Sequence, residues 1–343
     1  LNKMRYTILK IKFRDFIFIF LKNISFIFKV FFTGKKSYLL SFLFLKIFFQ
    51  IKFAENLVNK YIKISKIFFH YDVLVSPYFC FALHLKSIKT FAVQERPFQY
   101  LYFRYYFFDH YFTVNNQFNN LLSKNGYYVS HYSSFGLPRA YYADHLLKNR
   151  LFKNNFHNFR SNFLFIGLLC SDDESIGSFG EDGTSIKSNL NFLNLIDDVS
   201  TKYPSIGMHI SFKEHRFLNK KIFQPIYNKL KSKKNIFFYD NDQKSNIYIL
   251  SNYSNLIISK YSSIVDDMLS IGKKVLIDDT EKYICNFNYY LSDDPICITS
   301  KKEILDAIDN YKNISYDKYD NFFNKKYSYE EYYNNIKYYI NHH

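Results

Sequence analysis

A pair of serines at the start of a predicted helix could bind a phosphorylated ligand. Ser262 and Ser263 follow the apolar run 256–259, which has the length of a buried parallel strand. In an open parallel sheet, the turn after a strand lies at the carboxyl edge, where ligands bind. Hydroxyl groups and backbone N–H groups at a helix N-terminus would face an anion there. The pattern therefore indicates an anion site, for which a phosphate is the natural ligand.

Asp267 adds a group that could recognise a sugar. It comes four residues after Ser263, which is about one helical turn, so both side chains lie close to the same helix face. A carboxylate accepts hydrogen bonds and could take them from sugar hydroxyls. The alternative is structural, with a serine that caps the helix and a solvated acidic face behind it. The sequence pattern leaves both interpretations open.

A strand, a helix and a second strand are predicted to position these residues. Ile264, Met268 and Ile271 recur at helical spacing, and Gly272 follows them as a predicted C-terminal cap. The apolar run 274–277 then predicts the second strand. Elsewhere in the chain, runs of strand length alternate with helical patterns. This alternation predicts an α/β protein built on doubly wound parallel sheets.

The segment 262–278 resembles the donor-binding segment of GT-B-fold glycosyltransferases. The resemblance rests on the two serines, the acid Asp267, the pair Gly272-Lys273 and an apolar strand that ends in Asp278. It is strongest to the bacterial enzymes that make capsule, lipopolysaccharide and glycerophosphate polymers, which usually carry Glu in place of Asp267. The resemblance implies two Rossmann-like domains with a cleft between them, and a nucleotide-sugar donor held by both serines and Asp267.

A second segment of the resemblance supplies a candidate catalytic base. The predicted strand 90–93 is followed by Gln94, Glu95 and Arg96, where the relatives carry Gln-His-Gly. Glu95 takes the place of the histidine, and the resemblance implies that it removes a proton from the acceptor hydroxyl. A carboxylate can do so when burial raises its pKa towards neutrality. The alternative is that Glu95 forms an ion pair with Arg96 or Arg104.

Two further groups of polar residues follow predicted strands of the second domain. Lys213 and His215 follow the strand 207–212 and resemble the basic-x-His sequence that the relatives place against the donor phosphates. The alternative for Lys213 is a solvated surface turn. The runner-up candidates for the base or for a sugar contact lie in an acidic loop, and they are Asp172, Asp173 and Glu174.

Neither a metal site nor an additional cofactor is expected. No Asp-x-Asp motif is placed to hold a nucleotide-bound metal, and neither a Walker loop nor a Gly-x-Gly-x-x-Gly motif occurs. Without a metal ion, helix N-termini, hydroxyl groups and cationic side chains must stabilise the leaving diphosphate. The nucleotide sugar would then be a substrate rather than a cofactor.

The sequence divides into four predicted parts. Residues 1–70 are basic and rich in phenylalanine, and residues 71–150 complete an N-terminal acceptor domain. In the relatives, a Gly-x-Pro turn closes this domain, and Gly136-Leu137-Pro138 matches it here. Residues 163–310 are predicted to form the C-terminal domain for the nucleotide donor, and residues 311–343 a helical tail.

Positive charge is concentrated near the N-terminus. Residues 1–70 carry 14 basic and two acidic side chains, which gives +12 of the net charge of +16. Lys22, Lys29 and Lys36 would share one face of a helix whose opposite face is apolar. The segment either lies on an anionic membrane surface or forms core helices of the first domain, and both interpretations stay open. It contains no apolar run long enough to span a membrane.

Other sequence features bear on partners and compartment. No zinc-finger spacing and no RNA-binding signature accompanies the positive charge, so nucleic acid is not an expected partner. The four cysteines lack CxxC spacing, which favours reduced thiols and a cytoplasmic protein. Together with the basic segment, this predicts a peripheral protein on the inner face of the cytoplasmic membrane.

One function and two alternatives follow from the residues and the resemblance. The expected function is metal-independent transfer of a sugar from a nucleotide-activated donor to a surface polysaccharide or a lipid-linked glycan. The first alternative is a nucleotide-sugar 2-epimerase of the same fold, which needs no acceptor. The second is a non-catalytic subunit of a glycan-synthesis complex, in which the changes at Glu95 and Asp267 reflect lost activity.

Overall fold

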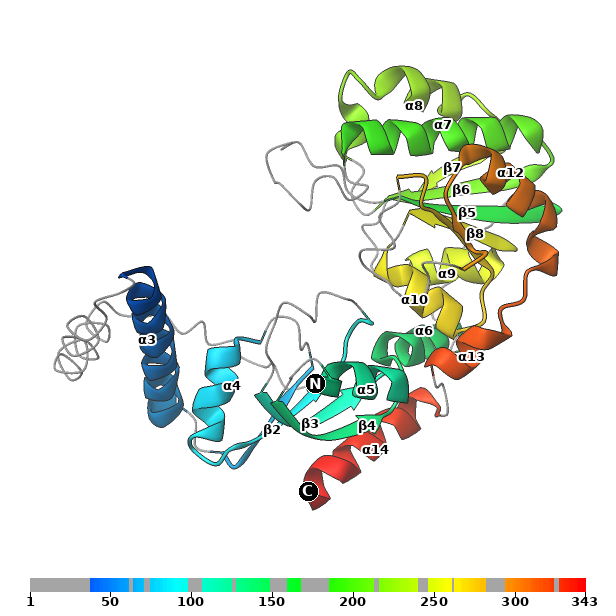
Figure 1. The fold of residues 1–343 in the computed structure, drawn as a ribbon. Helices are drawn as coiled ribbons and strands as arrows, with labels where there is room; N and C mark the ends of the chain where they lie inside the picture. The colour runs from blue at the N-terminus through cyan, green and yellow to red at the C-terminus, as the bar shows by residue number, and fades with distance from the viewer. Residues whose placement is uncertain are drawn as a thin grey trace. The chain divides into compact units, whose positions relative to one another are not determined.

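The computed structural model forms two compact units, and each is described by itself (Figure 1). Unit 1 draws its residues from Leu1–Val93, Phe103–Phe112 and Leu121–Tyr132, and unit 2 from Gln94–Tyr102, Thr113–Asn120 and Ser133–His343. The structure describes residues 38–61, 64–70, 75–97, 107–124, 128–148, 159–167, 185–212, 216–239, 246–260, 262–281, 294–323 and 327–343.

A four-stranded sheet with the order β1-β2-β3-β4 forms the centre of unit 1. Parallel pairing joins β1 to β2 and β2 to β3. Helices α3 and α4 pack their small and aliphatic residues, among them Ala54 and Leu83, against Ile67 and Phe69 of β1. The bounds are α3 Tyr38–Tyr61, β1 Lys66–Phe69, α4 Pro77–His84, β2 Lys89–Val93, β3 Phe107–Thr113, α5 Asn116–Lys124 and β4 Tyr128–Ser134.

Unit 2 is built on a six-stranded sheet with the order β10-β9-β8-β5-β6-β7. Every pair of neighbouring strands is parallel. The chain builds outwards from β5 to one side and then returns to β8 on the other, so the topological switch point lies between β5 and β8. The bounds are β5 Ser161–Gly167, β6 Ile206–Phe212, β7 Ile236–Tyr239, β8 Leu256–Lys260, β9 Val275–Asp278 and β10 Cys297–Ile298.

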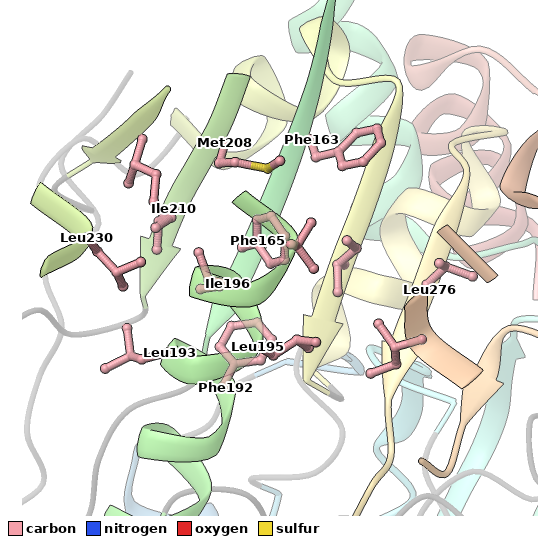
Figure 2. Close-up of a cluster of buried hydrophobic side chains, with 14 of the residues drawn as sticks. Phe163, Phe165, Phe192, Leu193, Leu195, Ile196, Met208, Ile210, Leu230 and Leu276 are labelled. Atoms are coloured by element: carbon pink, nitrogen blue, oxygen red, sulfur yellow. The ribbon is translucent and has the colours of Figure 1, made fainter. Parts of the chain in front are cut away.

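Helices cover both faces of the six-stranded sheet (Figure 1). On one face, α7 (Ile186–Lys202), α8 (Gln224–Lys231) and α12 (Lys301–Asn310) share one buried core with the strands. Figure 2 shows part of this core, in which Phe192 and Ile196 of α7 lie over Phe165 of β5. On the opposite face lie α9 (Asn246–Tyr253) and α10 (Ser263–Ser270). Buried strands of this kind carry continuous apolar runs, as the sequence predicted.

Gly167, the last described residue of β5, leaves no room for a side chain. A Cβ atom at this position would lie 2.1 Å from the ring of Phe212, its register partner on β6. The glycine therefore allows the Phe212 ring to pack against the backbone of β5.

The predicted strand–helix–strand unit over residues 256–279 is confirmed as β8, α10 and β9. Gly272 has φ of +75°, a left-handed conformation that glycine adopts without strain. The N–H groups of Gly272 and Lys273 donate to the carbonyls of Leu269 and Met268. This is the Schellman arrangement, so the predicted C-terminal cap is also confirmed.

Three further helices complete unit 2, namely α6 (Pro138–Lys148), α13 (Asp317–Phe323) and α14 (Tyr329–His342). Tyr141 of α6 stacks on the buried Tyr332 of α14 with ring centroids 4.4 Å apart. A capping box between Ser328 and Glu331 begins α14. The prediction of helices after residue 311 is therefore confirmed.

In the N-terminal part, the structure describes the strand β1 at Lys66–Phe69 and the helix α4, which begins at Pro77. Proline favours the first turn of a helix, where its missing N–H has no partner to lose. Residues 71–74 and the predicted lysine-bearing helix over Lys22, Lys29 and Lys36 lie outside the described residues. None of the described helices is both long and apolar enough to cross a membrane.

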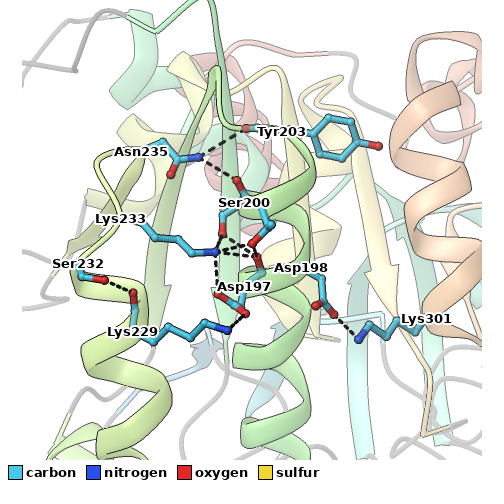
Figure 3. A network of polar contacts seen from close by, with 10 residues as sticks. Asp197, Asp198, Ser200, Tyr203, Lys229, Ser232, Lys233, Asn235 and Lys301 are labelled. Atoms are coloured by element: carbon cyan, nitrogen blue, oxygen red, sulfur yellow. Dashed lines mark hydrogen bonds and ion pairs between the residues drawn. The ribbon is translucent and has the colours of Figure 1, made fainter.

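A polar network ties α8 to the last turn of α7 (Figure 3). Lys233 Nζ pairs with Asp197 Oδ1 at 2.7 Å and donates to the Asp197 carbonyl and to the hydroxyls of Ser200 and Thr201. Lys229 Nζ pairs with the other carboxylate oxygen of Asp197 at 2.7 Å. Burial alone would raise the pKa of Asp197, but hydrogen bonds from both lysines bring it below its usual range. The ionised carboxylate therefore stabilises the end of α7.

Replacing Lys233→Met should lower the free energy of unfolding by about 1–3 kcal/mol, because it leaves the end of α7 and Asp197 without a partly buried donor. The matched change Lys229→Met should have a much smaller effect, since that side chain is 60% exposed and water screens its charge. Urea unfolding measures both. The contribution of the Asp197 carboxylate is present at neutral pH and is lost as the pH falls below about 4 and through the lowered pKa of the folded state, so the difference between Lys233→Met and wild type should become smaller in acid. The hydrogen bonds of Lys233 to the Asp197 carbonyl and to the two hydroxyls should keep part of that difference. Equal losses for the two lysines would contradict this assignment.

Candidate functional site

Helix α10 begins at the carboxyl edge of the six-stranded sheet, where the sequence predicted an anion site. Ser262 is its N-cap, with φ of −145°, and its side chain makes no capping hydrogen bond. Asp266 and Asp267 are each 1% exposed. The acidic residues of α10 are therefore buried, and the alternative of a solvated acidic face does not describe them.

The guanidinium of Arg139 links the start of α10 to the residues that follow β2. Arg139 lies in the first turn of α6, directly after the turn Gly136-Leu137-Pro138, in which Gly136 has φ of +89°. Its Nη1 donates to Ser263 Oγ at 2.9 Å and to Glu95 Oε1 at 3.2 Å. Its Nη2 pairs with Asp267 Oδ2 at 2.9 Å. One cation thus joins three of the predicted site residues.

One carboxylate oxygen of Asp267 is held by two donors, and the other has no described partner. Its Oδ2 atom accepts from Arg139 and also from the hydroxyl of Tyr248 on α9, at 3.0 Å. Its Oδ1 atom is buried and has no hydrogen-bond partner within the described ranges. The carboxylate is therefore oriented by two protein donors, while its second oxygen can accept from a ligand.

Glu95 is buried between two arginines. It is 5% exposed, and its Oε2 atom lies 2.5 Å from Nε of Arg96. Its Oε1 atom accepts from Arg139. The ion pair with Arg96 that the sequence allowed is therefore present, and Arg104 lies outside the described residues. Because Arg139 also binds Asp267, the two carboxylates share one counterion.

Burial and charge shift the ionisation of this cluster in opposite directions. Burial is the main cause that raises the pKa of Asp267 to about 6, and the charge of Arg139 and the hydrogen bond from Tyr248 oppose it. Burial likewise raises the pKa of Tyr248 above its usual range. For Arg139, burial would lower the pKa, but the charge of Asp267 raises it, so the guanidinium stays cationic.

A second buried cation lies at the topological switch point. Lys260, the last residue of β8, is 3% exposed, and its Nζ atom donates to Ser188 Oγ and pairs with Glu281 Oε2 at 3.3 Å. Ser188 belongs to the first turn of α7, which follows β5, and Glu281 follows β9. The ends of β8 and β9 and the start of α7 thus meet at the carboxyl edge, the usual place for a ligand in an open α/β sheet.

The structure brings together some of the predicted site residues and leaves others undescribed. Glu95, Ser263 and Asp267 meet around Arg139, and Ser262 adjoins them. Lys213, His215, Asp172, Asp173 and Glu174 lie outside the described residues, so their predicted roles stay predictions. Among the described side chains, no three His, Cys, Asp or Glu residues gather in a way that could hold a metal ion.

The sequence analysis did not identify Arg139 and Tyr248, which bind Asp267. It also did not identify the group formed by Lys260, Ser188 and Glu281. Two of them carried a readable signal. Arg139 directly follows the Gly-x-Pro turn, and Lys260 is a charged residue at the end of an apolar strand, where burial needs a partner. The others belong to ordinary helix and loop patterns, and only the fold reveals their contacts.

No protein-family model matches this chain, and no curated protein sequence does. Solved structures resemble it at low sequence identity. A UDP-GlcNAc 2-epimerase from Neisseria meningitidis bound to UDP-GlcNAc is 15% identical, with 84% of this chain and 80% of that chain covered and a TM-score of 0.55. A UDP-GlcNAc 2-epimerase from Methanocaldococcus jannaschii in complex with UDP-GlcNAc and UDP is 14% identical, with 85% of this chain and 80% of that chain covered and a TM-score of 0.57. S. aureus MnaA with UDP is 14% identical, with 86% of this chain and 79% of that chain covered and a TM-score of 0.52.

These similarities concern the fold. They agree with the two parallel sheets of the chain and confirm the predicted class, an α/β protein with two Rossmann-like domains of the GT-B type. At this level of identity, they carry no residue roles across to this sequence.

Replacing Arg139→Met should raise the pKa of Asp267 above its wild-type value of about 6, because the positive charge of Arg139 lowers it. A carboxyl whose pKa is raised by folding stabilises the protein in its protonated form, fully below about pH 4, and this contribution is lost as the pH rises through the folded pKa. In the variant, the stabilising contribution of Asp267 should therefore persist to higher pH. The total decrease in the free energy of unfolding between acid and neutral pH should be larger, by about 1.4 kcal/mol for each unit by which the pKa of Asp267 is raised.

Urea unfolding of both proteins between pH 4 and 8 tests this effect of Arg139. The exposed Arg160 provides the matched control, and Arg160→Met should follow the wild-type profile. If the profile of Arg139→Met also runs parallel to wild type, the guanidinium does not control the ionisation of Asp267.

Proposed function

We propose that this protein binds a nucleoside-diphosphate sugar at the start of α10 and transfers the sugar to a surface polysaccharide or a lipid-linked glycan. The observation that carries the proposal is the unsatisfied oxygen of Asp267. Its Oδ1 atom is buried without a partner in the described chain, while Arg139 and Tyr248 hold Oδ2. A hydroxyl of a ribose or a sugar is the natural donor to such an atom.

The phosphates of the donor have a suitable place beside Asp267. The N-terminus of α10 offers backbone N–H groups and the Ser262 hydroxyl, which makes no capping bond to a described residue. The Arg139 side chain, 26% exposed, provides a cation that suits a phosphate in geometry and charge. We include Lys213 and His215 as further phosphate contacts and Asp172, Asp173 and Glu174 as sugar contacts, on the sequence resemblance alone.

Glu95 is the proposed base. In the transfer step, Glu95 takes the proton of the acceptor hydroxyl while the acceptor oxygen forms a bond to the anomeric carbon. The bond from that carbon to the diphosphate oxygen breaks, and its electron pair leaves with the nucleoside diphosphate. Arg139 would stabilise the charge that develops on the leaving group, so no metal ion is required in this scheme. The basic residues 1–70 favour an acceptor at an anionic membrane surface.

A 2-epimerase is the second candidate, because the similar solved structures with UDP-GlcNAc are described as 2-epimerases. Inversion at C2 of the sugar needs one group to remove a proton from one face and another to return a proton to the opposite face. Glu95 and Asp267 are two carboxylates that both bind Arg139, which suits such a pair. This candidate differs from the transferase in needing no acceptor.

Binding is the first test, with UDP, CDP, GDP and CMP titrated into the protein by calorimetry. One nucleotide should bind selectively, and Asp267→Asn should weaken it about tenfold. An asparagine has one acceptor oxygen, which Arg139 and Tyr248 would take, so its amide nitrogen would face the ligand hydroxyl in place of Oδ1. Ser262→Ala should also weaken binding, whereas Ser270→Ala, at the other end of α10, should not.

The outcomes separate the functions. Absence of binding to all four nucleotides would overturn the proposed donor site. Where a nucleotide binds, release of the nucleoside diphosphate that depends on added acceptor identifies a transferase, and an epimer formed without acceptor identifies a 2-epimerase. Glu95→Gln should lower either rate about 100-fold or more. Binding with no turnover of the matching nucleotide sugar would favour a non-catalytic subunit.

A further inference from the structure

Gln94 carries a buried amide nitrogen that the described chain does not use. The side chain is 0% exposed, and its Oε1 atom accepts from the backbone N–H of Val114 at 3.0 Å. Its Nε2 atom has no partner among the described residues. Buried polar groups of folded proteins are almost always hydrogen-bonded. The two N–H bonds of this amide therefore call for an acceptor that the described residues do not supply.

The orientation of this amide is fixed by its neighbour. The N–H group of Val114 can bond only to an acceptor, which is the oxygen of the carboxamide. A reversed amide would place two donors against each other and lose this bond. The nitrogen of Gln94 is thus held in one direction, turned away from Val114.

Gln94 lies one residue from the candidate active site. It directly follows β2, and Val114 directly follows β3, which pairs in parallel with β2 through Val93 and Phe112. The carboxyl ends of parallel strands face the ligand in folds of this kind. The next residue, Glu95, binds Arg139, which in turn binds Asp267. The unused donor and the cluster around Arg139 therefore belong to the same short stretch of chain.

Two buried atoms of opposite character thus have no partner among the described residues. Gln94 Nε2 donates, and Asp267 Oδ1 accepts. A nucleotide sugar suits both, because a ribose hydroxyl can donate to Asp267 and an oxygen of the sugar can accept from Gln94. An apolar ligand would leave both atoms without a partner.

We propose that the carboxamide of Gln94 recognises the sugar of the donor, by donating a hydrogen bond to one of its oxygen atoms. The inference rests on the proposed binding of a nucleotide sugar and extends it to a residue that sets sugar specificity. Asp267 and the start of α10 then hold the nucleotide part, and Gln94 acts on the sugar alone.

The test compares the affinities for UDP and for UDP-GlcNAc, measured by calorimetry on the full chain. Wild type should bind UDP-GlcNAc more tightly than UDP. Gln94→Met has a similar size and no donor, so it should lose about tenfold in affinity for UDP-GlcNAc, as expected for one hydrogen bond, and stay within about twofold of wild type for UDP. If the methionine variant does not fold, Gln94→Glu keeps the oxygen that accepts from Val114.

Asn115 provides the matched control, because both ends of its buried amide are used within the protein. Its Nδ2 atom donates to the carbonyl of Phe322, and its Oδ1 atom accepts from the N–H of Phe118. Asn115→Leu should lower the melting temperature and leave the ratio of the two affinities unchanged.

Each remaining outcome counts against the inference. An unchanged affinity of the Gln94 variant for UDP-GlcNAc would overturn it and leave nucleotide binding intact. Equal losses for UDP and UDP-GlcNAc would assign Gln94 to the fold instead of the sugar. Failure of wild type to bind either compound would overturn both this inference and the proposed donor site for uridine nucleotides.

Discussion

The ion pairs of Arg139 are the interaction on which the arrangement of the site depends. Two buried carboxylates would repel each other and would each be costly to keep ionised away from water. The guanidinium offers donors in several directions within one plane, so it can bind Glu95, Ser263 and Asp267 together. A lysine could supply the charge but not this planar geometry. One side chain thus links the residues after β2 to α10.

Much of the six-stranded sheet could be predicted because its signals are local. Strands β8 and β9 are short apolar runs, and α10 between them has helical spacing, with serine before it and glycine after it. The N-terminal part lacked such contrast. The helix α3 is apolar or aromatic on most sides, and β1 is only four residues long. Neither the helical spacing nor the strand alternation of apolar residues can therefore be recognised in the sequence.

Only those site residues could be predicted that stand at the end of a strand or the start of a helix. Ser262, Ser263, Asp267 and Glu95 stand at strand ends or helix starts, and such places are visible in a sequence. Arg139 reaches Ser263 across 124 positions of sequence, and Tyr248 reaches Asp267 from a different helix. The unused nitrogen of Gln94 depends on its contact with Val114, 20 residues on. No periodicity encodes contacts of this kind, because they arise when separate elements pack.

The position of β5 at the centre of its sheet has a consequence for the order of folding. Its partners on the two sides, β6 and β8, begin 45 and 95 residues after Ser161, and Ser259 bonds to the carbonyl of Ile166 across 93 positions. One edge of β5 therefore stays without its neighbour until β8 has been synthesised. Parallel sheets with such distant pairings fold slowly and expose strand edges meanwhile. During translation, this half of the protein reaches its native form late, and chaperones have a long interval in which to bind it.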